Sequence, residues 1–125
     1  MKFMEDKPRS SIGTLRWFVQ AGLGILLVIL LGVHLIVNHL VAPQGLLSYA
    51  DVIRYYDVPG IALMEVLFLI VVTAHCLLGV HSILLDLNLP SSFTKTLIWV
   101  LVVLGVAGIV YGIRLTWVIA VMPVA

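Results

Sequence analysis

The sequence predicts an all-α membrane protein with three transmembrane helices. Of its 125 residues, 62% are hydrophobic and 10% are charged, and the mean hydropathy of +1.21 lies far above that of soluble domains. Residues 18–41, 61–80 and 97–113 together contain one charged side chain, that of Glu65. Each segment is long enough to cross ~30 Å of hydrocarbon at ~1.5 Å per residue of helix. A soluble domain of this length needs a polar face toward water, so that class is excluded.

Helix-breaking and capping residues set the ends of these spans within one domain, residues 1–125. Pro43 ends the first span and Pro90 follows the second, because proline cannot continue a helix. Ser91 or Ser92 is expected to N-cap the third span. The expected helices cover residues 14–42, 59–87 and 92–122.

Residues 46–56, between the first two spans, mix apolar and polar side chains. Ser48, Asp51 and Arg54 recur every third position among leucine, valine, isoleucine and tyrosine. This spacing predicts a short helix that lies in the membrane interface, with its tyrosines at headgroup depth.

The basic residues favour a cytoplasmic N-terminus. Four of them precede or open the first span, whereas the loop between the first two spans has only Arg54. Lys95, between the second and third spans, then lies on the cytoplasmic side as well. The four N-terminal basic residues are Lys2, Lys7, Arg9 and Arg16.

Charge and cysteine content exclude further classes. The formal net charge of +1 comes without a basic stripe of interleaved aromatic residues, so no nucleic-acid partner is expected. The single Cys76 excludes a disulfide framework.

Glycines are frequent in the three spans. Small residues let neighbouring helices or a flat cofactor approach closely, so they favour a bundle completed by a partner membrane subunit. These glycines are Gly22, Gly24, Gly32, Gly79, Gly105, Gly108 and Gly112.

Two histidines, His34 and His75, lie deep in the first and second spans. A polar ring inside a membrane is costly, so each is a candidate functional residue. His39 is five positions after His34 and His81 is six after His75, offsets that do not share a helix face, so each helix supplies one ligand per cofactor. A buried imidazole in a membrane helix is a typical axial ligand of haem iron.

Helix neighbours and depth refine this prediction. Gly79 and Asn38 are each one turn after a deep histidine and are expected to leave room beside His75 and to orient a group at His34. His75 lies roughly 16 Å, and His34 roughly 27 Å, from the cytoplasmic face. We therefore expect two stacked haems, each completed by a histidine of another subunit. The alternative is that only His75 binds haem and His34 meets headgroups.

Other polar residues have two interpretations each. Glu65 and Arg114 lie at similar heights and are expected to form a structural pair, unless Arg114 contacts a haem propionate or Glu65 transfers protons. Arg16 is an interfacial anchor, or reaches a propionate or a quinone oxygen. Asp86 caps the second helix or binds a partner, or belongs to a quinone pocket.

Residues 75–86 resemble a motif of the membrane-anchor subunits of succinate dehydrogenase and fumarate reductase (complex II). In that family the second helix carries H-x-x-x-G-x-x-x-x-x-x-D, matched here by His75, Gly79 and Asp86. Residues 32–39, which contain His34, resemble the end of the first helix in anchors that hold two haems. The resemblance covers the first two spans.

The resemblance implies a non-catalytic subunit of succinate:quinone oxidoreductase in the cell inner (cytoplasmic) membrane. It would anchor a flavoprotein subunit and an iron–sulfur subunit, and pass electrons to quinone. Its expected cofactor is haem b, one or two copies shared with a second membrane-anchor subunit, and membrane lipid surrounds it. This places the chain in the respiratory chain and the tricarboxylic acid cycle.

The resemblance implies two kinds of site residue, those that contact haem and those that contact quinone. His75 and His34 are the expected iron ligands, with His39 as the alternative outer ligand. Leu87 follows Asp86 where smaller anchors often have tyrosine, and the first span lacks the serine and arginine that larger anchors use for quinone. These features favour a smaller, D-type anchor with a shared quinone site. The other expected haem contacts are Gly79, Arg16 and Arg114, and the expected quinone contacts are Asp86 and His81.

Two other functions remain open from the sequence. One is a haem b subunit of another respiratory enzyme, such as a membrane-bound hydrogenase or formate dehydrogenase. The other is a haem-free assembly or transport subunit whose histidines pair with Glu65 or with neighbouring groups.

Overall fold

Three long helices and one short helix make up the part of the chain that the computed structural model describes, residues 11–41 and 48–123. No strand occurs within these ranges. All three long helices are apolar enough to cross a membrane, each with a mean hydropathy of 2.4 in its best window, which confirms the predicted all-α class with three spans. The elements are α1 (Ser11–Ile36), the π-helical turn η1 (Val37–Val41), α2 (Tyr49–Asp57), α3 (Ile61–Asp86) and α4 (Ser91–Ala120).

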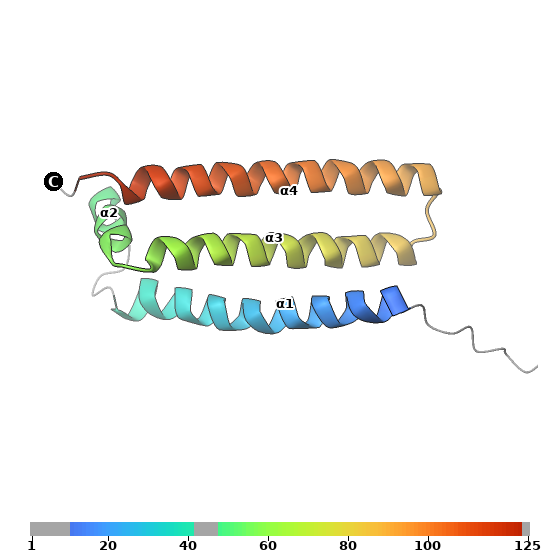
Figure 1. The fold of residues 1–125 in the computed structure, drawn as a ribbon, viewed down its shortest axis with the longest axis horizontal. Helices are drawn as coiled ribbons and strands as arrows, with labels where there is room; N and C mark the ends of the chain where they lie inside the picture. Colours follow the sequence, from blue (N-terminus) through green and yellow to red (C-terminus); the bar gives the residue numbers. More distant parts are fainter. Residues whose placement is uncertain (1–10, 42–47, 124–125) are drawn as a thin grey trace, which may run out of the picture.

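The long helices lie side by side with α3 in the middle (Figure 1). α3 packs against α1 on one side and α4 on the other, and within the described residues α1 and α4 make no contact. The short α2 crosses the bundle at the end where α4 finishes, and it contacts both α3 and α4. Most apolar side chains of this thin layer therefore face outward, as lipid or a partner subunit requires.

The helix ends differ from the predicted bounds by a few residues. α1 begins at Ser11 rather than at residue 14, and α3 covers 61–86 instead of 59–87. The predicted serine N-cap of α4 is wrong, because the helix already starts at Ser91 and Pro90 is the capping residue, without a side-chain bond. The Pro90 carbonyl accepts the first helical hydrogen bond, from Thr94 N at 3.0 Å. The predicted end of the first helix at residue 42 lies outside the described residues.

The helix within residues 46–56 is present as α2, and a capping box defines its start. Ser48 Oγ accepts a hydrogen bond from Asp51 N at 3.2 Å, and Asp51 Oδ2 accepts one from Ser48 N at 2.9 Å. Such reciprocal bonds satisfy donors that the first turn would leave open. At the same end, the Tyr49 hydroxyl donates to Met122 Sδ at 2.9 Å and ties α2 to the chain beyond α4.

Some of the glycines are used within the chain. A Cβ at Gly105 would come to 3.0 Å from Leu77 Cδ1, so this glycine lets α4 approach α3 closely. A Cβ added at Gly22, Gly32 or Gly108 would meet no other side chain or helix of the described residues within 4 Å. These three positions face open space outside the layer.

Candidate cofactor sites

The imidazole of His75 lies at the α1–α3 interface near the middle of α3. A Cβ added to Gly24 of α1 would come to 3.2 Å from His75 Cε1 and 3.7 Å from Nδ1, so the ring rests in the space that this glycine leaves. Nδ1 is buried and has no hydrogen-bond partner. No side chain or backbone group of the described residues bonds to either ring nitrogen. An unsatisfied buried nitrogen costs about 1–3 kcal/mol, so His75 Nδ1 stands apart from the large majority of buried polar atoms, which are hydrogen-bonded.

The residues around His75 differ from the prediction in one respect. Gly79 does not make the room beside the imidazole; a Cβ there would meet Gln20 Nε2 at 3.3 Å. The Gln20 amide in turn donates to the His75 carbonyl oxygen at 3.2 Å. The imidazole points across to the facing helix rather than along its own, so Gly24 makes the room.

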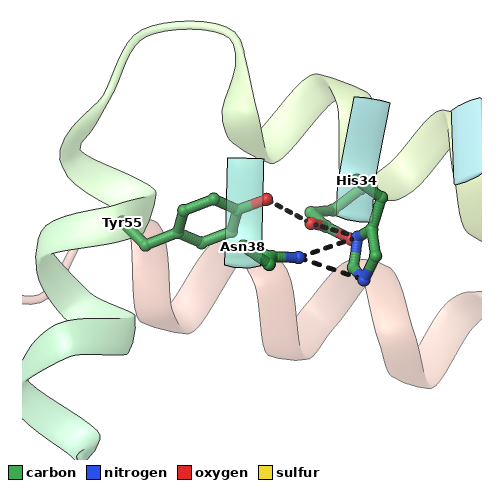
Figure 2. A network of polar contacts seen from close by, with 4 residues as sticks. His34, Asn38 and Tyr55 are labelled. Carbon is green, nitrogen blue, oxygen red and sulfur yellow. Dashed lines mark hydrogen bonds and ion pairs between the residues drawn. The ribbon is translucent and has the colours of Figure 1, made fainter. Parts of the chain in front are cut away.

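His34 belongs to a polar cluster with Asn38, Tyr55 and Glu65, at the end of the layer where α2 lies (Figure 2). Its Nδ1 lies 3.0 Å from Glu65 Oε1, and the Asn38 amide nitrogen lies 3.0 Å from Nε2 and 3.1 Å from Nδ1. The Tyr55 hydroxyl donates to the same Glu65 oxygen at 2.5 Å. A carboxylate only accepts, so Nδ1 carries a proton. The Asn38 amide N–H is a donor, so Nε2 of the neutral ring accepts from it through its lone pair.

Local structure accounts for how this cluster assembles. His34 is in the last turn of α1 and stacks on Phe68 of α3, with ring centroids 5.2 Å apart and an interplanar angle of 21°. The chain then widens into the π turn η1, which carries Asn38; π turns are common at functional sites. Asn38 is 6% exposed, and its Oδ1 is buried without a partner. The turn thus holds a polar amide inside the layer, beside the His34 ring.

Tyr55 joins the cluster from outside the spans. It is one of the few buried apolar or aromatic residues, with 9% of its surface exposed. Burial, and then the hydrogen bond and negative charge of Glu65, raise the pKa of the Tyr55 hydroxyl. The hydroxyl therefore remains a proton donor to Glu65 at all ordinary pH values.

The predicted Glu65–Arg114 pair is wrong. The Glu65 carboxylate is held by His34 and Tyr55, whereas Arg114 is exposed on α4 and has no hydrogen bond or ion pair within residues 11–41 and 48–123. Glu65 and Arg114 lie at similar heights on α3 and α4, but they do not pair, because the Glu65 side chain is turned toward α1 and α2. Two signals for the actual cluster were present in the sequence: the one-turn offset of Asn38 from His34, and Glu65 as the one charged side chain of residues 18–41, 61–80 and 97–113.

A further polar contact joins α1 and α3 at the end opposite to α2. Arg16 Nη2 lies 2.5 Å from His81 Nδ1 and 3.1 Å from Nε2. A guanidinium only donates, so the His81 ring accepts here through a neutral nitrogen. His81 also lines a hollow of about 370 Å³ between α3 and α4, together with Leu84, Asn88, Ser91, Thr94 and Lys95.

Two curated proteins are similar to this chain over most of its length. One, the succinate dehydrogenase hydrophobic membrane anchor subunit of Thermoplasma acidophilum, is 28% identical over 97% of this chain and 98% of its own length. The protein of the same name from Archaeoglobus fulgidus is 30% identical over 66% of this chain and 70% of its own. The chain belongs to the succinate dehydrogenase membrane-anchor family. No protein-family model matches it, and no solved structure gives a significant match.

The anchor subunit brings some of its predicted site residues together and keeps others apart. Arg16 and His81, predicted for different ligands, are in contact. His34 and His75 belong to separate clusters, and no three side chains of the metal-ligating types meet within the described residues. Asp86 is exposed at the last position of α3, and His39 is exposed in η1.

Proposed function

We propose that this anchor subunit binds haem b through His75 and His34 and passes electrons from the succinate-oxidising subunits to membrane quinone. Haem b held by two histidines is a one-electron carrier without an open iron position. The observation that carries the proposal is the His75 imidazole, which lies inside a membrane span without a partner at either ring nitrogen. A polar ring inside a membrane span is by default a candidate functional residue, and a haem iron would supply the partner that the chain does not.

His34 suits the same role for a different reason. Metal-bound histidines commonly donate their second ring N–H to a carboxylate, which fixes the ring and its tautomer. The Nδ1 contact of 3.0 Å with Glu65 is of this kind and would leave Nε2 as the nitrogen that binds iron. The Asn38 amide lies 3.0 Å from Nε2 and would have to move aside for iron to bind that nitrogen.

Each histidine supplies one axial ligand, so the second must come from another chain. The outward apolar faces of α1 and α4 suit a partner membrane-anchor subunit, and Gly22, Gly32 and Gly108 offer small surfaces for close approach.

We place the subunit in the inner (cytoplasmic) membrane, and the basic residues near its N-terminus favour a cytoplasmic N-terminus. The flavoprotein and iron–sulfur subunits then dock at the end that holds Arg16 and Asp86.

Quinone binding is proposed at that same end. Arg16 and His81 present hydrogen-bonding groups to a carbonyl oxygen, and the neighbouring hollow of about 370 Å³ is lined mainly by leucine and short polar side chains. Ligand sites of this kind combine apolar walls with a few polar groups. Asp86 lies at the edge of the same region, as the last residue of α3.

A reduced-minus-oxidised spectrum of the purified complex tests this function. His75→Ala removes one b-type absorbance, and His34→Ala removes the other. Cys76→Ala, an exposed neighbour on the same helix, is the control and leaves both. A colourless wild-type complex, or full absorbance in the His75→Ala complex, contradicts the proposal.

A further inference from the structure

The two candidate iron-binding histidines differ in what holds their second nitrogen. His34 Nδ1 lies 3.0 Å from a carboxylate oxygen of Glu65, whereas His75 Nδ1 is buried without any partner. Both rings are half-buried in apolar spans. The two histidines therefore differ in the hydrogen-bond partner of Nδ1 and not in their exposure.

We propose that Glu65 is a positioning residue for His34, which holds its ring with Nε2 toward iron and lowers the midpoint potential of iron bound there. The inference rests on the proposed function, and adds to it the residue that tunes the site. Tyr55 opposes Glu65 by donating to the same oxygen. The two residues thus form a pair with opposite effects on one ligand.

The direction of the Glu65 effect follows from the hydrogen bond. A carboxylate that accepts the Nδ1 proton makes the imidazole a more basic, more electron-donating ligand. Such a ligand stabilises the ferric over the ferrous state, and the negative charge close to the site adds to this preference. Only 14% of the Glu65 side chain is exposed, so water screens its charge weakly.

The Tyr55 effect has the opposite sign. Its hydroxyl lies 2.5 Å from Glu65 Oε1, the same atom that faces His34. A short hydrogen bond to an ionised acceptor is strong and draws negative charge toward the donor. The phenol therefore weakens the pull of the carboxylate on the imidazole proton.

Potentiometric titration of the haem absorbance in the whole complex tests the proposal. Glu65→Gln keeps the size of the side chain and removes its charge. We expect the midpoint potential of the His34-dependent haem to rise by ~59 mV. For one electron this corresponds to a tenfold change in the oxidised-to-reduced ratio. Tyr55→Phe is expected to lower the same potential.

Tyr49→Phe is the matched control. Tyr49 is on α2 as Tyr55 is, and the substitution removes one hydroxyl that bonds to Met122 rather than to Glu65. It should leave both haem potentials unchanged. The His75-dependent haem serves as an internal reference in every variant.

The outcomes separate this inference from the proposed function. A wild-type complex without a His34-dependent haem overturns the proposed function at this site. With that haem present, unchanged potentials in both Glu65→Gln and Tyr55→Phe overturn the role of Glu65. Loss of only the His34-dependent haem in Glu65→Gln supports the positioning role. If that variant does not assemble, Tyr55→Phe alone decides, and a potential that stays or rises refutes the pairing.

Discussion

The imidazole of His75 on α3 rests against Gly24 on α1, so closely that a side chain at position 24 would press on the ring. A Cβ there would lie 3.2 Å from the ring carbon Cε1. The two helices thus meet at the ring itself. Any haem site at His75 depends on this packing.

Enlarging Gly24 is predicted to disturb the His75 site. Gly24→Val adds three side-chain carbons, the first of them already 3.2 Å from the ring, and should destabilise the complex by roughly 1–3 kcal/mol, as overpacking does. The haem absorbance that depends on His75 should fall in parallel. Gly24→Ala, which adds only the Cβ at 3.2 Å from the ring, is the comparison and should lose less of the absorbance than Gly24→Val. Full absorbance in Gly24→Val would count against the close contact.

Breaking the Arg16–His81 contact is predicted to weaken quinone use without loss of haem. Arg16→Gln removes the charge that bonds to His81 Nδ1. The KM for quinone should rise roughly tenfold, equivalent to ~1.4 kcal/mol, the scale of one charge-assisted hydrogen bond. Steady-state succinate:quinone reduction measures this. Arg54→Gln, on α2 at the other end, should leave KM unchanged; a similar rise there would point to a general effect of charge.

The raised pKa of Tyr55 predicts a pH window for the docking of α2. Folding favours the protonated hydroxyl, so its stabilising contribution is complete below the ordinary pKa of 10.0 and is lost as pH rises above that value. Thermal melting of the purified protein between pH 8 and 11.5 is the measurement. Wild-type stability should decline more steeply above pH 10 than that of Tyr55→Phe. Parallel curves would show that this hydroxyl ionises normally.

The capping box of α2 is predicted to contribute measurably to stability. Ser48→Ala removes the oxygen that accepts from Asp51 N and should cost about 1 kcal/mol, the usual value for an N-cap. Thr96→Ala removes a hydroxyl that bonds only within its own helix, to the Ser92 carbonyl at 3.0 Å. It should change stability by less than about 0.5 kcal/mol. Chemical or thermal unfolding of the two variants compares them.

Composition and helix signals were sufficient to predict the three membrane-spanning helices. Apolar surface is costly in water and unpaired backbone is costly in lipid, so few structures are possible for such segments. The short helix between the first two spans followed from its periodicity. The serine cap of α4 did not follow, because Pro90 supplies the starting carbonyl and the helix begins one residue earlier. Local rules thus identified the four α-helices, but neither their first residues nor the π turn η1 (Val37–Val41).

The sequence by itself determined the three spans, the family resemblance and the two histidines that stand out in an apolar setting. Only the tertiary structure decided the partners: Glu65 with His34 rather than with Arg114, Gly24 rather than Gly79 beside His75, and Arg16 with His81. Position along a helix is encoded locally, at 3.6 residues per turn. Which faces of two helices meet depends on the packing of the whole layer, and in this protein that packing determines the surroundings of each candidate ligand.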